Sequence, residues 1–104
     1  MQISEEDIGK AITGIMRSID AEYEQMTEAD LASRWHFKFD PERSMEANMY
    51  LFYDYLALYA GSCRRWEERH NGNCCVVERV RDKYVMPKIR EFAEQVRALQ
   101  PVTQ

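Results

Sequence analysis

The sequence has few of the residues that build small-molecule sites. Its 104 residues include four glycines, all of them isolated, so no segment has the glycine-rich pattern of a phosphate-binding loop. Neither of its two histidines stands beside a serine, threonine or cysteine in a nucleophile motif. We therefore expect no catalytic site and no cofactor, which means that the protein is not an enzyme.

Long hydrophobic runs are also missing. The most apolar stretch, residues 49–60, is interrupted by Asp54 and contains four tyrosines, which makes it too short and too polar to cross a bilayer. The first seven residues lack both the basic start and the apolar segment of a signal peptide. These absences predict a soluble, cytoplasmic protein that is not bound to a membrane.

Cysteine is scarce, and its pattern does not indicate disulfides. There are three cysteines, an odd number, and a bond between the adjacent Cys74 and Cys75 would be strained. We expect reduced thiols with a structural role. A chain of this length buries a core without cross-links, so residues 1–104 are expected to form one domain with residues 100–104 as a frayed tail.

What the sequence does contain is typical of a globular protein, with 45% hydrophobic and 31% charged residues. The net charge of -4 is unevenly divided along the chain. Residues 1–62 carry 12 acidic and 5 basic side chains, whereas residues 63–104 carry 6 acidic and 9 basic ones. Such an asymmetry steers an oppositely charged partner or helps two copies to pair in opposite directions.

Residues 4–26 have the pattern of a capped amphipathic helix. Ser4 and Asp7 resemble a capping box, with acidic residues in the first turn. Because glycine lowers helix propensity, Gly9 and Gly14 are expected to permit the close approach of a neighbouring helix. Apolar residues recur at spacings of three and four, which predicts one buried stripe: Ile8, Ile12, Ile15, Ile19, Tyr23 and Met26.

A second capping pattern, at residues 27–30, predicts a short helix that ends near Arg34. Residues 35–39 then alternate between apolar and polar side chains. Since the chain has no second strand signal, we expect an extended connector whose Trp35, Phe37 and Phe39 plug the core.

Asp40 and Pro41 predict the start of the main helix, as an aspartate cap followed by proline at the first helical position. This helix is expected to run from Pro41 to His70, with any bend at Gly61 and Ser62. Its buried seam follows a heptad-like spacing: Met45, Met49, Phe52, Leu56, Tyr59, Cys63, Trp66 and His70.

Residues 71–73, Asn-Gly-Asn, predict a tight turn between two antiparallel helices. The helix after the turn is expected to start at Cys74. Its apolar stripe changes phase at Pro87, where we expect a kink. The fold class that follows is all-α: a small bundle of three to five helices with a long central helix and an α-α hairpin.

Side chains of the kinds that bind metals gather around this turn. Glu67 and His70 lie one helical turn apart, and four-helix di-iron proteins use such a Glu-x-x-His pair on each of two helices. This chain has one such pair, and its cysteines are poorly spaced for zinc. A metal- or thiol-dependent helical protein is therefore the alternative hypothesis, with four candidate ligands: Cys63, Glu67, His70 and Cys74.

A basic cluster gives a second alternative. Arg64, Arg65 and Arg69 precede the turn and would suit an anionic partner such as nucleic acid. The interleaved Glu67 and Glu68 favour ion pairs within the helix instead. Nucleic acid is thus not the partner that we expect.

The main helix is apolar nearly all round. Between Met45 and Ala60 the strongly polar residues are Glu46, Asn48 and Asp54, and these do not share one face. Such a helix is wrapped by its neighbours or buried in an interface, and tyrosine is favoured at interfaces. We therefore predict a partner-binding surface on this helix: Tyr50, Leu51, Tyr53, Asp54, Tyr55 and Leu58.

Together these features predict a small, non-catalytic protein-binding module. We expect an inhibitor or regulator that occupies the surface of a basic partner protein, as small phage-encoded antagonists do. We also expect a homodimer that forms through the main helix.

Overall fold

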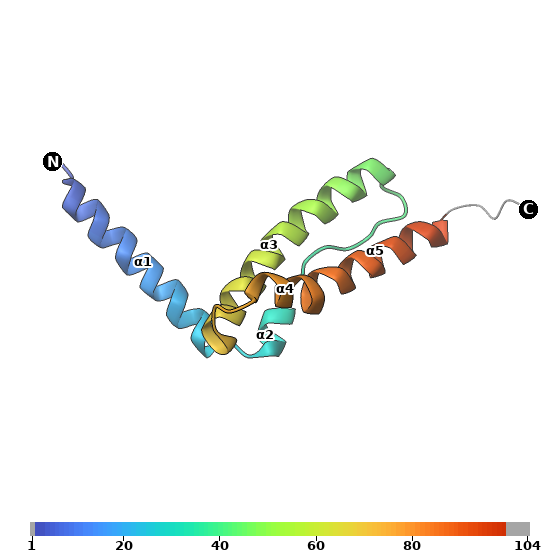
Figure 1. The fold of residues 1–104 in the computed structure, drawn as a ribbon. Helices are drawn as coiled ribbons and strands as arrows, with labels where there is room; N and C mark the ends of the chain where they lie inside the picture. Colours follow the sequence, from blue (N-terminus) through green and yellow to red (C-terminus); the bar gives the residue numbers. More distant parts are fainter. Residues whose placement is uncertain (1, 100–104) are drawn as a thin grey trace, which may run out of the picture.

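A computed structural model describes residues 2–99 of the chain, and the expected tail at residues 100–104 lies outside this part. The fold is all-α, as predicted, with a long central helix and a helical hairpin, and no strand occurs among the described residues (Figure 1). The elements are α1 (Glu5–Gln25), α2 (Glu28–Ala32), α3 (Met45–Asn71), α4 (Val76–Val80), the π-helix η1 (Arg81–Val85) and α5 (Met86–Leu99).

The molecule is elongated. Its radius of gyration is 18.6 Å and its extents are 68 × 37 × 21 Å, whereas a compact domain of this length has a radius of gyration of about 13 Å. Figure 1 shows the cause: α1 meets the other helices only at its C-terminal end and diverges from α3, so the two helices form a V. We call the place where they meet the apex.

Both predicted N-terminal caps are present. The Ser4 hydroxyl accepts a hydrogen bond from the Asp7 amide at the start of α1. At the start of α2, Thr27 and Asp30 form a complete capping box, each side chain accepting from the other's backbone amide. α2 ends at Ala32, slightly before the predicted Arg34.

The predicted start of the main helix is wrong. Residues 40–43 form a turn closed by a hydrogen bond of 3.1 Å from the Arg43 amide to the Asp40 carbonyl, and α3 begins at Met45 with Ser44 as its cap. Aspartate followed by proline is also the signature of such a turn. Beyond its start the helix is uninterrupted through Gly61 to Asn71.

The connector after α2 plugs the core, as predicted. Phe37 is buried, and its ring contacts Phe52 of α3 and Phe92 of α5 at centroid distances of 5.4 and 5.8 Å. Phe52 and Phe92 are stacked at 4.3 Å. Trp35 and Phe39 extend this aromatic cluster on either side, so the connector joins α3 to α5.

A second core region lies near the apex. The Trp66 indole donates a hydrogen bond of 2.8 Å to the Met26 carbonyl, which ties α3 to the end of α1. The predicted seam of α3 is buried here but not at its ends, since Met49 and His70 are exposed. The buried cluster comprises Tyr23, Met26, Leu31, Tyr59, Cys63, Trp66, Val76 and Val80.

The hairpin turn has the expected glycine and an unexpected cysteine in unusual backbone conformations. Gly72 has φ +82°, and Cys75 has φ +61°, in the left-handed region that non-glycine residues rarely occupy. The helix therefore starts at Val76 rather than at Cys74. Cys74 and Cys75 are exposed, so the expectation of three structural thiols is wrong for these two.

The expected kink at Pro87 takes the form of a π-helical turn. The Met86 amide donates to the Arg81 carbonyl, five residues back, at the end of η1. In α-helical geometry the ring of Pro87 would collide with the carbonyl of Lys83 and leave it without a partner. A π turn inserts one extra residue, which accounts for the change of phase in the apolar stripe.

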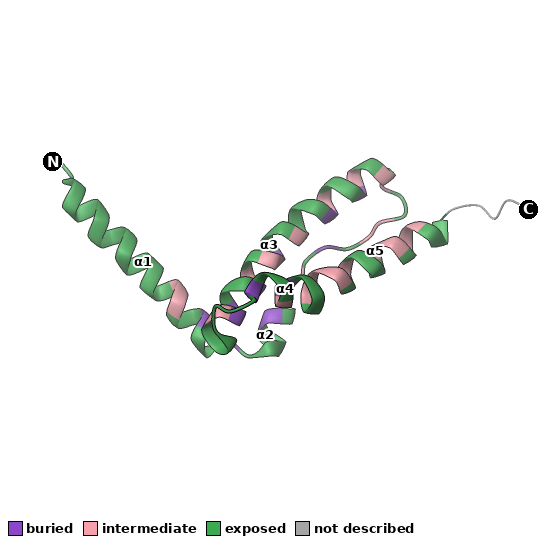
Figure 2. Cartoon of the chain, in the orientation of Figure 1, coloured by how far each residue is buried: buried purple, intermediate pink, exposed green. Residues whose placement is uncertain are grey.

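The greatest departure from the sequence prediction is in α1. Ile8, Ile12 and Ile15 are exposed rather than buried, although Tyr23 and Met26 on the same stripe are in the core (Figure 2). A Cβ atom added at Gly9 or Gly14 would meet no described atom within 4 Å. The predicted stripe is therefore covered only near the apex.

Candidate functional site

Helix α3 presents two apolar faces outside the core. One carries Glu46, Met49, Tyr50 and Tyr53, at helical spacings of three and four, and we call it the tyrosine face. The other carries Leu51, Tyr55 and Leu58, and we call it the leucine face. The six predicted partner-binding residues are thus divided between two surfaces, with Asp54 exposed between them.

The tyrosine face is the more open of the two. Tyr50 is 67% exposed and Tyr53 is 73% exposed, and Met49 beside them is also mostly exposed. Together with Glu46 they line a shallow depression of about 510 Å³. Tyrosine contributes apolar area and a hydroxyl at a low cost in side-chain entropy, so this arrangement suits contact with a protein surface.

The leucine face points along the inside of the V. Ser62, one turn after Leu58, accepts a hydrogen bond of 3.0 Å from the Tyr23 hydroxyl of α1. Leu58 is 71% exposed because α1 has already diverged at this level, whereas Leu51 is half-buried. Tyr55 lies at the edge of the aromatic cluster, 6.4 Å from the Phe37 ring.

The candidate basic patch is engaged within the chain. Arg64 forms an ion pair of 2.9 Å with Glu68 one turn on. Arg69 pairs with Asp20 of α1, and the Arg65 guanidinium lies 6.0 Å from the centre of the Tyr23 ring. The contacts of Arg69 and Arg65 join α3 to α1 at the apex, and the two ion pairs partly neutralise the charges of Arg64 and Arg69 that a nucleic acid would need.

The four candidate metal ligands are not gathered at one point. Cys63 is buried in the core, where desolvation raises the pKa of its thiol to about 12. His70 stacks on Trp66 at 4.0 Å and its Nδ1 lies 2.9 Å from the Trp66 carbonyl. Cys74 is exposed on the hairpin turn. Within residues 2–99 no three His, Cys, Asp or Glu side chains lie close enough together to hold a metal ion.

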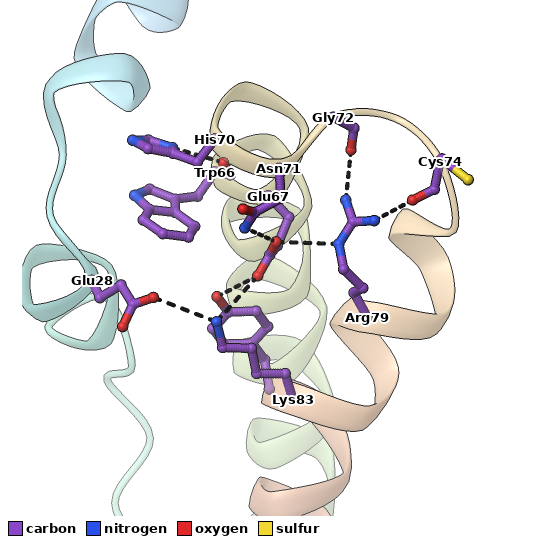
Figure 3. Close-up of polar contacts among 10 residues, drawn as sticks. Glu28, Trp66, Glu67, His70, Asn71, Gly72, Cys74, Arg79 and Lys83 are labelled. Atoms are coloured by element: carbon purple, nitrogen blue, oxygen red, sulfur yellow. Dashed lines mark hydrogen bonds and ion pairs between the residues drawn. The ribbon is translucent and has the colours of Figure 1, made fainter.

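Glu67 has a different role, which the sequence did not reveal. Its carboxylate is 1% exposed and accepts hydrogen bonds from Tyr84 at 2.8 Å and Asn71 at 2.6 Å (Figure 3). Arg79 donates to it at 3.3 Å, and the Lys83 ammonium lies 3.5 Å away. We call these five residues the Glu67 network.

The electrostatics of this network favour a charged carboxylate. Desolvation acts to raise the pKa of Glu67, but the hydrogen bonds from Asn71, Tyr84 and Arg79 and the charge of Lys83 outweigh it, so the pKa is lowered. The desolvated Tyr84 hydroxyl, bonded to this carboxylate, has a raised pKa. Near neutral pH Glu67 therefore stays ionised and Tyr84 keeps its proton, which suits structural support rather than acid-base chemistry.

The network also secures the hairpin turn. Besides Glu67, the Arg79 guanidinium binds the carbonyls of Gly72, at 2.5 Å, and Cys74. Lys83 extends the network to α2 through Glu28, at 3.4 Å (Figure 3). The interleaved acids and bases of residues 64–83 were visible in the sequence, but only the folded hairpin shows which of them pair between helices.

None of the helices within residues 2–99 has the length and apolarity required to span a membrane. The tyrosine face, the leucine face and the exposed stripe of α1 are apolar surfaces that the other described elements leave largely uncovered. No family model, curated protein or solved structure matches the chain.

Proposed function

We propose that this chain is a non-catalytic protein-binding module that regulates or inhibits a partner by occupying part of its surface. The observation that supports this proposal is the tyrosine face, because it exposes two tyrosines and a methionine side by side on a regular helix of 27 residues. Contiguous apolar groups of this kind on a protein surface mark interaction sites.

Charge gives the class of partner. Glu46 lines the depression of the tyrosine face, and the exposed Asp54 lies at its border. The whole half of the chain before Cys63 carries more than twice as many acidic as basic side chains. A basic protein surface complements this field, and such complementarity accelerates association.

The first test is a photo-crosslink made in the native host. A benzoylphenylalanine in place of Tyr53 is expected to capture one basic protein, whereas the same group in place of Arg90, on the exposed side of α5, is expected to capture none. Equal capture at the two positions, or none at Tyr53, would contradict the proposed surface.

The second test uses the captured partner in binding kinetics. Tyr53→Ala is expected to speed dissociation by about 10- to 30-fold, as loss of a buried aromatic contact does. Glu46→Lys is expected mainly to slow association and to weaken its dependence on salt. Arg64→Ala is the matched control. If it abolishes binding while the other two variants bind normally, the basic patch is the functional surface instead.

A further inference from the structure

The exposed part of α1 is a continuation of a packed seam. Tyr23 and Met26 of this seam lie in the core and Ile19 is half-buried against it, but the next three turns toward the N-terminus are uncovered. There Ile8, Ile12 and Ile15 are between 48% and 60% exposed. We call Ile8, Ile12, Ile15 and Ile19 the isoleucine stripe.

The isoleucine stripe is symmetric along the helix. Its members are spaced four, three and four residues apart, so the series reads the same in both directions and consists of one residue type. Two copies of α1 placed antiparallel therefore match: Ile8 of each lies opposite Ile19 of the other, and Ile12 opposite Ile15. A two-fold interface requires this kind of self-complementary surface.

The positions that flank the stripe suit a close approach of two helices. They are Gly9, Ala11, Met16 and Ser18, none of which is charged. In the antiparallel arrangement Met16 of one copy lies beside Gly9 of the other, so a large side chain faces a residue without one. The charged side chains Lys10 and Arg17 lie on the outer side of the helix, away from the stripe.

Charge favours the antiparallel direction over the parallel one. Parallel helices would bring the acidic first turns, residues 5–7, of both copies together. Antiparallel helices instead bring this turn to the level of residues 20–22 of the other copy. At that level the other copy carries Asp20 and Glu22, which are paired with Arg69 and Arg34, and Arg65 lies over Tyr23. The acidic turn thus meets carboxylates whose charge is balanced by arginines, rather than a second acidic turn.

The leucine face supplies the rest of the contact. A specific interface buries about 800 Å² on each partner, more than a single row of half-exposed isoleucines offers. Leu58 faces the inside of the V, opposite the isoleucine stripe, and is exposed there. We propose that α1 of a second copy of this chain occupies the V, antiparallel to α1, packed against the isoleucine stripe and Leu58.

This inference moves the expected self-contact from the middle of the main helix to α1 and the inner side of α3. It leaves the tyrosine face free for the partner protein. The two proposals are therefore independent, and either can fail without the other.

The first measurement is the mass in solution by sedimentation equilibrium. The wild type is expected to have twice the chain mass of 12.4 kDa, and Ile12→Glu is expected to raise the dimer dissociation constant by at least about 30-fold. Tyr53→Glu is the matched control, since it places the same charge at a more exposed position of the tyrosine face, and it is expected to leave the dimer intact. Ile8→Gln provides a second, milder variant.

The circular dichroism spectrum distinguishes loss of the dimer from unfolding of the variant. Because Ile12 is half-exposed in the single chain, its variant is expected to remain as helical as the wild type while becoming monomeric. A wild type that is still monomeric at a concentration of about 100 μM would overturn the proposal. So would a dimer that is lost with Tyr53→Glu and kept with both isoleucine variants.

The direction is tested with cysteines introduced into a Cys74→Ser, Cys75→Ser background, in which the remaining Cys63 is buried. A mixture of the Ile8→Cys and Ile19→Cys proteins is expected to form a covalent heterodimer under mild oxidation. Ile8→Cys alone is expected not to cross-link, because two antiparallel copies of residue 8 are about 16 Å apart along the helix. Self-cross-linking of Ile8→Cys with none in the mixture would show parallel helices and overturn the arrangement.

Discussion

Replacing Glu67 by glutamine tests whether the Glu67 network holds the hairpin together. The substitution keeps the size of the side chain and removes its charge. Breaking a fully buried ion pair by removing one partner costs about 3–5 kcal/mol. Here the cationic partners are less buried, since the side chain of Arg79 is 29% exposed and that of Lys83 is 51% exposed. In the variant Arg79 also keeps the Gly72 carbonyl as an acceptor, and Lys83 keeps Glu28.

We therefore expect Glu67→Gln to lower the free energy of unfolding by about 2–3 kcal/mol. For a domain of this size that corresponds to a decrease in Tm of about 10–20 °C. The assay is urea unfolding followed by circular dichroism at 222 nm. Glu68→Gln is the matched control: this neighbouring carboxylate pairs with the exposed Arg64, and its loss is expected to cost less than about 1 kcal/mol.

The pH dependence of the difference in unfolding free energy between the wild type and Glu67→Gln tests the same reasoning independently. The pKa of Glu67 is lower in the folded protein than its ordinary value of 4.5, so its stabilising effect is complete above pH 4.5 and is lost as the pH falls through the folded pKa. Glutamine does not titrate. The stability advantage of the wild type over Glu67→Gln should therefore shrink below pH 4.5. Two results would refute this reasoning. One is an equal loss of unfolding free energy in Glu67→Gln and Glu68→Gln, and the other is a stability difference between the wild type and Glu67→Gln that is the same at pH 5 and pH 3.

Three further predictions concern buried side chains and thiols. Cys63→Ala is expected to lower the free energy of unfolding by about 1–2 kcal/mol, because a fully buried side chain leaves a small cavity, while partner binding by the refolded variant stays unchanged. In the native protein a thiol reagent is expected to modify the exposed Cys74 and Cys75 only, and Cys63 is expected to react after denaturation. Rapid modification of all three cysteines in the native protein would contradict the burial of Cys63. Asn48→Ala is expected to cost about 2–3 kcal/mol in urea unfolding, since this fully buried amide bonds the backbone of Asp40 and Arg43; a cost below 1 kcal/mol would show that the turn does not need it.

Local signals in this sequence were predictive where a single interaction decides the structure. The caps at Ser4 and Thr27 and the glycine of the hairpin turn depend on hydrogen bonds or dihedral angles within a few residues, and the structure has them at the expected places. Residues 40–41 show the limit of such signals. Aspartate followed by proline starts a helix or a turn equally well, and in the structure the turn is hydrogen-bonded by Asn48 of α3, which is distant from residues 40–41 in the sequence pattern.

Long-range signals failed for a different reason. A stripe of isoleucines predicts that a surface will be covered, but not by which element, and in this chain the helix that carries the stripe leaves the body before anything covers it. The split of the predicted surface on α3 has a similar origin. Tyr53 and Leu58 belong to one apolar helix in the sequence, and only the position of α1 assigns Leu58 to the inside of the V. Pairing in the Glu67 network likewise required the fold of the hairpin.

Because α1 is attached to the other helices at its C-terminal end, a small rotation there produces a large displacement of its N-terminal end. Its 21 residues extend over about 31 Å. Near the apex α1 is held to α3 by the packing of Tyr23 and Met26 in the core and by polar contacts that include Tyr23 with Ser62, Asp20 with Arg69 and the Met26 carbonyl with Trp66. A rotation of 10° about the apex moves the N-terminal end by roughly 5 Å, the rise of one helical turn. The width of the opening between α1 and α3 therefore depends on a few side chains at the apex.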